Sequence, residues 1–154
     1  MDGVGFSEDL GSQRALMLSP EMFRRFLLPE YTYIFENVLS AGKIVNFHSC
    51  GCVDAIAGDL ADIGITILNP IQARANDLEK LKKSVSGKMA LWGGIDTQLL
   101  LKGTPDAVRQ ETIRVFGILK PGGGFVCAPD QYFPNMPEEN LKALWDTAKE
   151  YGVY

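Results

Sequence analysis

The sequence lacks the features that would place it in a membrane, in a secretory route or on nucleic acid. No apolar run approaches the roughly eighteen residues needed to cross a bilayer. The first residues, 1–11, have neither a positively charged region nor an apolar core, so they do not form a secretory signal. Basic residues are not in excess, since the formal net charge is −4. We therefore expect neither membrane insertion nor nucleic-acid binding.

Cysteine is scarce, and the motifs of several large enzyme classes are missing. The three cysteines are an odd number, and Cys50 and Cys52 are separated by one residue. A disulfide framework is therefore not expected, and reduced thiols in a cytoplasmic protein are the better interpretation. The chain contains no P-loop, no GxSxG elbow and no GxGxxG loop. This excludes the simplest NTPase, hydrolase and dinucleotide-binding readings.

What is present is a regular alternation of short apolar runs and helical stretches over residues 1–154, predicted to form one domain. Strands are predicted at 4–6, 43–47, 65–68, 89–92 and 125–128. Helices are predicted from Ser19, with a break or kink at Pro29, and at 30–41, 53–63, 77–85, from Thr104 to the turn at Pro121, and at 137–151. Such βα units form a parallel sheet with right-handed connections. An open doubly wound sheet and a barrel both fit this pattern.

Polar side chains follow each predicted strand. The carboxyl ends of parallel strands meet at one edge of a sheet, where α/β proteins place their functional groups. The residues at these positions are Glu8 and Asp9; His48, Cys50 and Cys52; Asn69 and Gln72; Asp96 and Gln98; and Asp130 and Gln131. Their repetition after five strands predicts a site at this edge.

The sharpest pattern is His48-x-Cys50. Residues two apart in an extended segment point to the same side, so an imidazole and a thiolate can ligate one tetrahedral ion such as Zn²⁺. A structural alternative is a buried histidine beside a small apolar cysteine. A zinc site needs a third protein ligand. The candidates are Cys127, Cys52, Glu8, Asp9 and Asp130.

The remaining strand-end residues have a functional and a structural interpretation. Glu8 and Asp9 are candidates for the catalytic carboxylates, with a solvated turn or cap as the alternative. Four polar residues are candidates for binding substrate, with ordinary loop polarity as the alternative: Asn69, Gln72, Asp96 and Gln98.

Taken together, the motifs resemble the C-terminal part of the uroporphyrinogen decarboxylase superfamily, specifically its cobamide-dependent methyltransferase-like branch. The resemblance runs in order along nearly the whole chain. The matching stretches are EDLGSQ (8–13), SPEMFRRFLLPEY (19–31), FHSCGCV (47–53), DIGITILNPIQ (62–72), GGIDTQ (93–98), GTPDAV (103–108), GGGFVCAPDQ (122–131) and EENLKALWDTAKEYGVY (138–154).

The resemblance implies a fold and a metal site. The fold would be a (β/α)₈ TIM barrel, which needs about 250 residues, so this chain would form a partial barrel of about five βα units. In the methyltransferase members the HxC motif supplies two zinc ligands, which His48 and Cys50 match. A later cysteine supplies the third. At that position this sequence has Asp130 and Gln131, whereas Cys127 lies earlier, so the third ligand stays open.

The resemblance also implies a reaction. Zinc would activate a thiol or a methyl donor, and the methyl group would pass to or from a corrinoid carried by a partner protein. The partners implied are a small-molecule methyl donor or acceptor and that corrinoid protein. One alternative is decarboxylation of a porphyrinogen, although the family's key arginine and aspartate groups for that reaction lie in N-terminal segments. A non-catalytic barrel fragment is the other alternative.

Overall fold

The computed structural model describes residues 2–153 and contains one parallel sheet flanked by helices. The strands lie in the order β1-β2-β3-β4-β5, and each neighbouring pair is parallel. Their bounds are β1 Gly3–Ser7, β2 Ile44–His48, β3 Ile67–Ile71, β4 Ala90–Ile95 and β5 Phe125–Pro129. The helices are α1 Pro20–Met22, the π-helix η1 Phe23–Leu27, α2 Leu28–Ser40, α3 Ala57–Asp62, α4 Leu78–Val85, α5 Thr97–Lys102, α6 Pro105–Leu119 and α7 Glu138–Tyr151.

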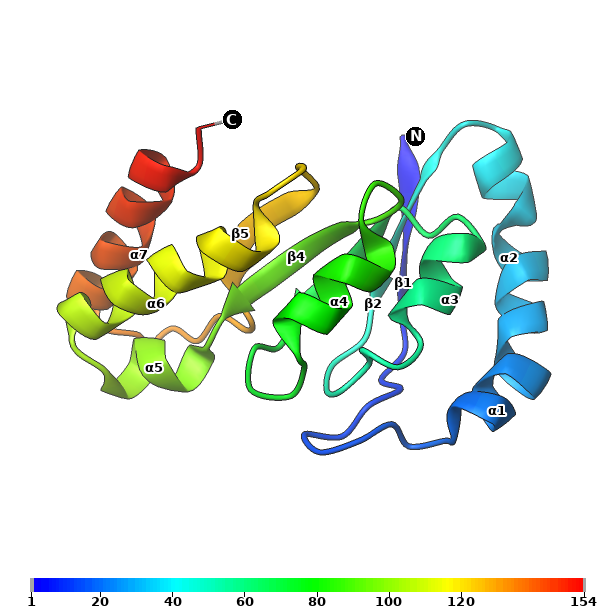
Figure 1. Cartoon of the computed structure of the whole chain (residues 1–154), viewed down its shortest axis with the longest axis horizontal. Helices are drawn as coiled ribbons and strands as arrows, with labels where there is room; N and C mark the ends of the chain where they lie inside the picture. Colours follow the sequence, from blue (N-terminus) through cyan, green and yellow to red (C-terminus); the bar gives the residue numbers. More distant parts are fainter. Residues whose placement is uncertain (1, 154) are drawn as a thin grey trace.

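The strand order decides between the two architectures that the sequence left open. A doubly wound sheet reverses its strand order at a switch point, whereas this sheet adds strands in sequence without a reversal. In Figure 1, α3, α4 and α6 lie in front of the strands, on one face of the sheet. The protein is therefore a partial TIM-type barrel of five parallel strands with helices on its outer face, as predicted.

The core lies between the sheet and the helices, because alternate strand residues point to the helical side. Val45 and Phe47 of β2, Leu68 of β3 and Leu91 of β4 are fully buried there. Complete burial of each such side chain contributes roughly 1.5–3 kcal/mol to folding. The intervening residues of β2, including His48, point to the opposite face, so the core packing also sets the orientation of the site residue.

The opposite face of the sheet, which forms the interior of a closed barrel, is open in this chain. Large apolar side chains on it stay in contact with solvent: Ile44 is 43% exposed, Trp92 37% and Val126 45%. Within residues 2–153, β1 pairs only with β2 and β5 only with β4, which leaves both sheet edges without a partner strand. The chain thus presents two edges and an apolar face.

The first helix shows how the chain accommodates Pro29. The sequence predicts a break or kink there, and the structure instead has a π-helical segment directly before it. A proline inside a helix lacks an N–H and crowds the preceding turn. The wider π-turn of η1 lets the helix continue from α1 through Pro29 into α2. The side chain of Ser19 caps the first turn, as predicted.

Three further elements differ from the predicted ones. Strand β3 begins two residues later than predicted and contains Asn69, which the sequence reading placed after the strand. Helix α3 is shorter than the predicted 53–63 because residues 54–56 form a turn. The sequence pattern predicts no helix at the position of α5, although Asp96 caps its first turn by accepting a hydrogen bond from the Gln98 N–H. Short capped helices carry little periodicity, so the pattern had no signal for it.

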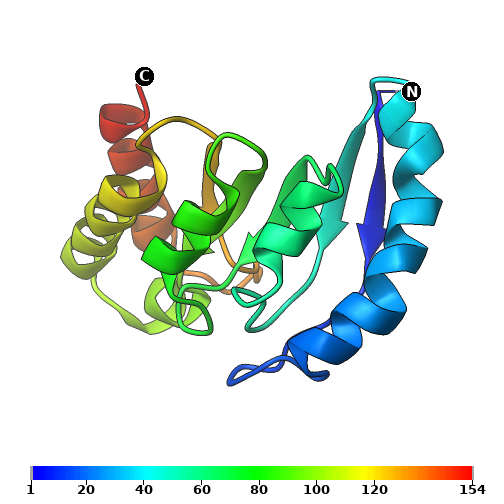
Figure 2. The ribbon, with the colours of Figure 1, turned by 45° about the vertical axis from the view of Figure 1, so that its right-hand side comes forward.

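The two ends of the barrel carry different parts of the chain. The start of β1 and the end of α7 lie at one end, and the connection from β1 to α1 lies at the other (Figures 1 and 2). The carboxyl ends of the strands therefore form a mouth at the end remote from the start of β1, where the site residues lie.

No helix in the described part of the chain is long and apolar enough to cross a membrane.

The open sheet leads to the first testable prediction. Exposed strand edges and an uncovered apolar face favour association with another chain, and a twofold dimer is the simplest closed form. We expect the 154-residue chain to form a homo-oligomer at micromolar concentration, measured by sedimentation or light scattering. A monomer that unfolds in one cooperative transition would contradict this expectation.

Candidate metal centre

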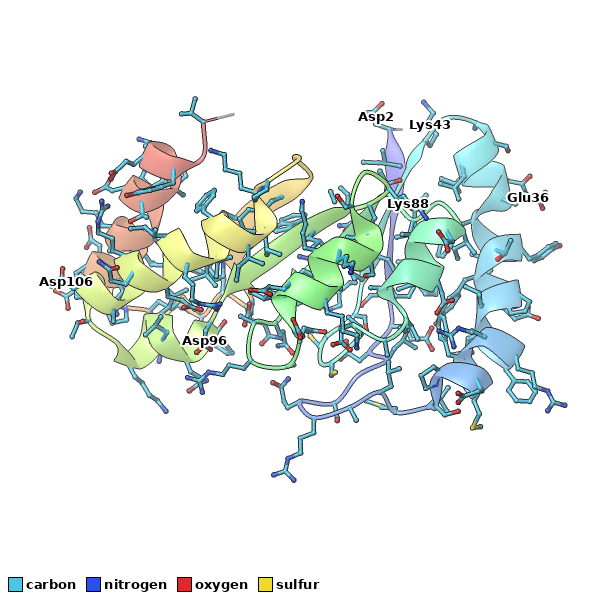
Figure 3. All side chains as sticks on the ribbon, viewed as in Figure 1. Asp2, Glu36, Lys43, Lys88, Asp96 and Asp106 are labelled. Carbon is cyan, nitrogen blue, oxygen red and sulfur yellow. The ribbon has the colours of Figure 1, made fainter. Side chains whose placement is uncertain are left out.

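The strand-end residues gather at the mouth of the partial barrel, as the parallel register requires. Ser7 pairs with His48 across β1 and β2, and His48 pairs with Asn69 across β2 and β3. Figure 3 shows the side chains and labels Asp96, which follows β4 at this end of the sheet. Residues from four of the five βα units are thereby brought within reach of one another.

Asp9, His48 and Cys50 form a group that can hold a metal ion. One ligand atom of each residue lies within 4.8 Å of the others. His48 Nε2 is 3.6 Å from Cys50 Sγ and 3.9 Å from Asp9 Oδ1. Asp9 is the most exposed of the three, and its Oδ1 also accepts a hydrogen bond from the Cys50 N–H at 2.9 Å. The nitrogen, sulfur and oxygen donors suit Zn²⁺.

The neighbour of His48 leaves the correct nitrogen free for a metal. His48 Nδ1 lies 3.0 Å from the side-chain oxygen of Asn69. A carbonyl oxygen can only accept a hydrogen bond, so Nδ1 carries the proton in the neutral ring. The lone pair is then on Nε2, the nitrogen that faces Cys50 and Asp9. This is the tautomer that ligation through Nε2 requires.

The surroundings of Cys50 make a bound cation fit the site. Burial raises the pKa of the Cys50 thiol, and the nearby Asp9 carboxylate raises it further. The Gln131 amide acts in the opposite direction by donating a hydrogen bond to Sγ at 3.5 Å. Two negative ligands side by side repel each other, and a divalent cation between them removes that repulsion. The charges of the group therefore match a metal ion.

The segment after His48 is held by residues that sequence reasoning did not single out. The buried Ser49 accepts a hydrogen bond from the Leu10 N–H, which ties this segment to the end of β1. The buried Asn76 amide binds the backbone of the same segment at Gly51 and Val53. The sequence predicts no role for either Ser49 or Asn76. Only the burial of a small polar side chain between two loops distinguishes them.

The other predicted metal ligands lie apart from this group. Cys127 is inside β5, and burial raises the pKa of its thiol to about 12. The Cys52 thiol points to the Asp54 carboxylate, with 3.8 Å between sulfur and oxygen. Among residues 2–153, neither cysteine joins Asp9, His48 and Cys50 in a ligand group. Of the residues predicted as a third ligand, Asp9 is the one whose side chain lies close to His48 and Cys50.

Asp130 also stays outside the ligand group, since its carboxylate is not among the donor atoms that lie within 4.8 Å of one another. Burial raises the pKa of its carboxyl to about 8, and the nearby Asp96 carboxylate contributes to the rise. Asp96 itself forms an ion pair with Arg74 and caps α5. The side chain of Gln98 is exposed at the start of that helix.

Glu8 has a partner that the sequence did not suggest. Its carboxylate accepts a hydrogen bond from the hydroxyl of Tyr31, a nearly fully buried residue of α2. Burial raises the pKa of Tyr31, and the bond to Glu8 raises it further, so the tyrosine stays protonated and donates. Beside Glu8 and Asp9 lies a hollow of about 270 Å³. Its walls are mostly apolar: Leu10, Leu16, Met17, Leu18, Phe23 and Leu27.

The protein is a partial (β/α) barrel with nitrogen, sulfur and oxygen donors at its mouth that could hold a metal ion. The family model of uroporphyrinogen decarboxylase (URO-D) matches residues 8–151. The chain belongs to this family. The resemblance predicted from the sequence is thereby confirmed.

Individual relatives are methyltransferases. The chain is 31% identical over 140 residues to the "Methylcobamide:CoM methyltransferase MtaA" of Methanosarcina barkeri, covering 88% of this chain and 38% of the relative. The same protein of the strain Fusaro / DSM 804 gives the same identity and coverage. The chain thus spans less than half the length of the curated relatives it matches.

Solved structures support the same fold. A methyltransferase from Methanosarcina mazei superposes with a TM-score of 0.74 at 26% identity, covering 99% of this chain and 43% of that one. A B12-independent methionine synthase from Shewanella sp. W3-18-1, in complex with selenomethionine, superposes with a TM-score of 0.65 at 13% identity. That match covers 97% of this chain and 48% of the synthase. The latter match supports the fold alone.

The close approach of two glycines at the site generates a stability prediction. Gly51 has a φ of +85°, and a Cβ there would overlap the carbonyl group of Gly11. Gly51→Ala should therefore lower the free energy of unfolding by about 3 kcal/mol or more, through strain and displacement of the loop. Urea unfolding measures this change.

Gly42→Ala is the matched control. Gly42 also has a positive φ of +68°, but a Cβ there meets no atom within 4 Å. This variant should lose only the conformational part, about 1 kcal/mol. Equal losses for the two variants would show that the contact between Gly11 and Gly51 is not tight in solution.

Proposed function

We propose that this chain forms part of a corrinoid-dependent methyltransferase, with Asp9, His48 and Cys50 as the ligands of a zinc ion. The observation that carries the proposal is the convergence of three donor atoms within 4.8 Å of one another at the mouth of the barrel. The name of the related Methylcobamide:CoM methyltransferase supports methyl transfer between a methylcobamide and a small molecule. The corrinoid would be carried by a partner protein.

The chemistry of the ligand set supports this activity. When bound, zinc supplies Lewis acidity and stabilises a thiolate at neutral pH. The protein's own residues hold the ligand atoms: Asn69 keeps His48 Nε2 free, and Gln131 donates to Cys50 Sγ. Asp9 gives the set a carboxylate oxygen in place of a second cysteine. Carboxylate oxygen is a harder donor than a thiolate and is an established ligand of zinc.

The hollow beside Glu8 and Asp9 is the proposed place of the small-molecule methyl donor or acceptor. Its walls are mostly apolar, and its acidic rim, which includes Asp9, lies next to the ligand group. Glu8 is the proposed catalytic carboxylate, since the Tyr31 hydroxyl fixes its position there. The roles of Asp96 and Gln98 in substrate binding stay predictions.

Decarboxylation of a porphyrinogen is supported by the family name alone. The convergence of an imidazole, a thiol and a carboxylate has no evident use in a reaction that needs no metal. The methyltransferase reading uses all three groups, and it is therefore the one we propose.

The ligand assignment predicts the outcome of metal analysis. Protein purified without chelator should hold one zinc ion per chain, because three ligand atoms already lie close together. His48→Ala combined with Cys50→Ala should abolish binding, and Asp9→Asn should weaken it by about tenfold or more. Elemental analysis and competition with a chromophoric chelator measure both effects.

Cys127→Ala is the control that separates the two candidates for the third ligand. Cys127 lies inside β5 and outside the group, so its variant should keep wild-type zinc affinity. If zinc is lost with Cys127→Ala and retained with Asp9→Asn, the third ligand is the cysteine. A wild-type protein that takes up no zinc would contradict the site itself.

The open barrel predicts that the isolated chain is inactive. It supplies five βα units of a mouth built from eight, so the groups that position both substrates are incomplete. We expect the 154-residue chain to transfer no methyl group to free cobalamin. The absorption spectrum of the corrinoid measures this reaction. Turnover by this chain would show that five units suffice.

A further inference from the structure

Three side-chain amides on one short segment, Asn69, Gln72 and Asn76, bind the loop that carries the candidate ligands. We propose that they are positioning residues, which fix the ring of His48 and the backbone of residues 49–54 in the ligating arrangement. The sequence predicts that Asn69 and Gln72 bind substrate, and it predicts no role for Asn76. The expected effects on zinc affinity rest on the proposed function, whereas the expected effect on the His48 ring does not.

Asn69 contacts the histidine through a cross-strand pair. It lies directly opposite His48 in the parallel register of β2 and β3, so both side chains point to the same face. Its side-chain oxygen is 3.0 Å from His48 Nδ1, and its backbone oxygen accepts from the Ser49 N–H at 2.8 Å. One residue therefore fixes both the ring and the first peptide of the loop.

Gln72 joins the loop to the segment after β1. Its Oε1 accepts from the Gly51 N–H and from the Gln13 side-chain amide, each at 2.7 Å. A carbonyl oxygen has two lone pairs, and both are used by these bonds. The oxygen is thus committed to protein groups, and it holds the two loops that carry Asp9 and Cys50 at a fixed separation.

Asn76 is the most completely bonded of the three. Its oxygen accepts from the N–H groups of Val53 at 2.8 Å and Asp54 at 3.1 Å. Its nitrogen donates to the carbonyl oxygens of Gly51 at 2.9 Å and Gln72 at 3.0 Å. The residue is 8% exposed, so these four bonds replace water entirely. Only an amide offers two donors and two acceptor sites in this shape.

The three amides bind different parts of the segment that begins at His48 and continues through residues 49–54. Asn69 selects the tautomer of His48, Gln72 fixes Gly51, and Asn76 closes the end of the loop. These contacts hold His48 Nε2 and Cys50 Sγ 3.6 Å apart. A site arranged in advance loses less conformational entropy on binding an ion.

The tautomer can be measured directly, because His48 is the only histidine in the sequence. Two-bond ¹H–¹⁵N NMR on metal-free, ¹⁵N-labelled protein at about pH 9, well above the ordinary imidazole pKa, reports which ring nitrogen carries the proton. The wild type should show Nδ1–H. Asn69→Leu and Asn69→Ala remove the acceptor and should shift the population toward Nε2–H, whereas Asn69→Asp keeps an acceptor and should retain Nδ1–H.

Asn37→Ala is the control, since Asn37 is an exposed asparagine of α2. It should leave the His48 spectrum unchanged. A wild-type spectrum dominated by Nε2–H would overturn the proposal without any variant. An unchanged tautomer in either folded Asn69 variant, with folding checked by circular dichroism, would overturn it as well.

Zinc affinity tests the loop contacts separately. Asn69→Leu and Gln72→Leu should each lower affinity by about 10–100-fold, the range found when the partner of a ligand is removed, and Gln72→Leu should leave the His48 tautomer unchanged. Wild-type affinity in both variants would overturn the positioning role. If the wild type binds no zinc but shows an Nδ1–H that depends on Asn69, the proposed function fails while the positioning role of Asn69 stands.

Discussion

The parallel register between β2 and β3 is the constraint on which the site depends. It sets His48 opposite Asn69, and the two side chains meet at 3.0 Å on the open face of the sheet. The same alternation that buries Val45 and Phe47 against the helices directs His48 to the other side. A slip of one residue would exchange the two faces and place an imidazole in the core. Core packing and site geometry are therefore fixed by one arrangement of hydrogen bonds.

Electrostatics at the mouth then separates the acidic residues into different roles. Asp9 is exposed and lies close to two other ligands, whereas Asp130 is buried near Asp96, with its pKa raised to about 8. Glu8 receives a hydrogen bond from Tyr31. The residue types are alike, but burial and neighbours give each carboxylate a different environment. The proposed ligand set of Asp9, His48 and Cys50 differs from the cysteine-rich one that the family resemblance implies.

The third ligand position is where the chain differs from the pattern that the family resemblance implies. Gln131 stands in the region where a cysteine is expected, and its amide donates a hydrogen bond to Cys50 Sγ. A neutral donor at this place stabilises the thiolate without adding negative charge. Asp9 supplies the charge from the other side of the mouth. In the proposed zinc site, the Cys50 thiolate and the Asp9 carboxylate would balance the charge of a divalent ion, with a carboxylate oxygen in place of a second sulfur donor.

The sequence by itself determined the βα alternation, because it depends on local periodicity. The family followed from the resemblance of whole motifs, and the i, i+2 spacing singled out His48 and Cys50. The sequence could not tell that Asp9, rather than Cys127, lies beside that pair, since long stretches of chain separate both residues from it. It also could not find Asn76, whose only distinguishing property is burial between two loops. Those assignments depend on distances across the sheet, and only the tertiary structure brings β1, β2 and β3 into the register that fixes them.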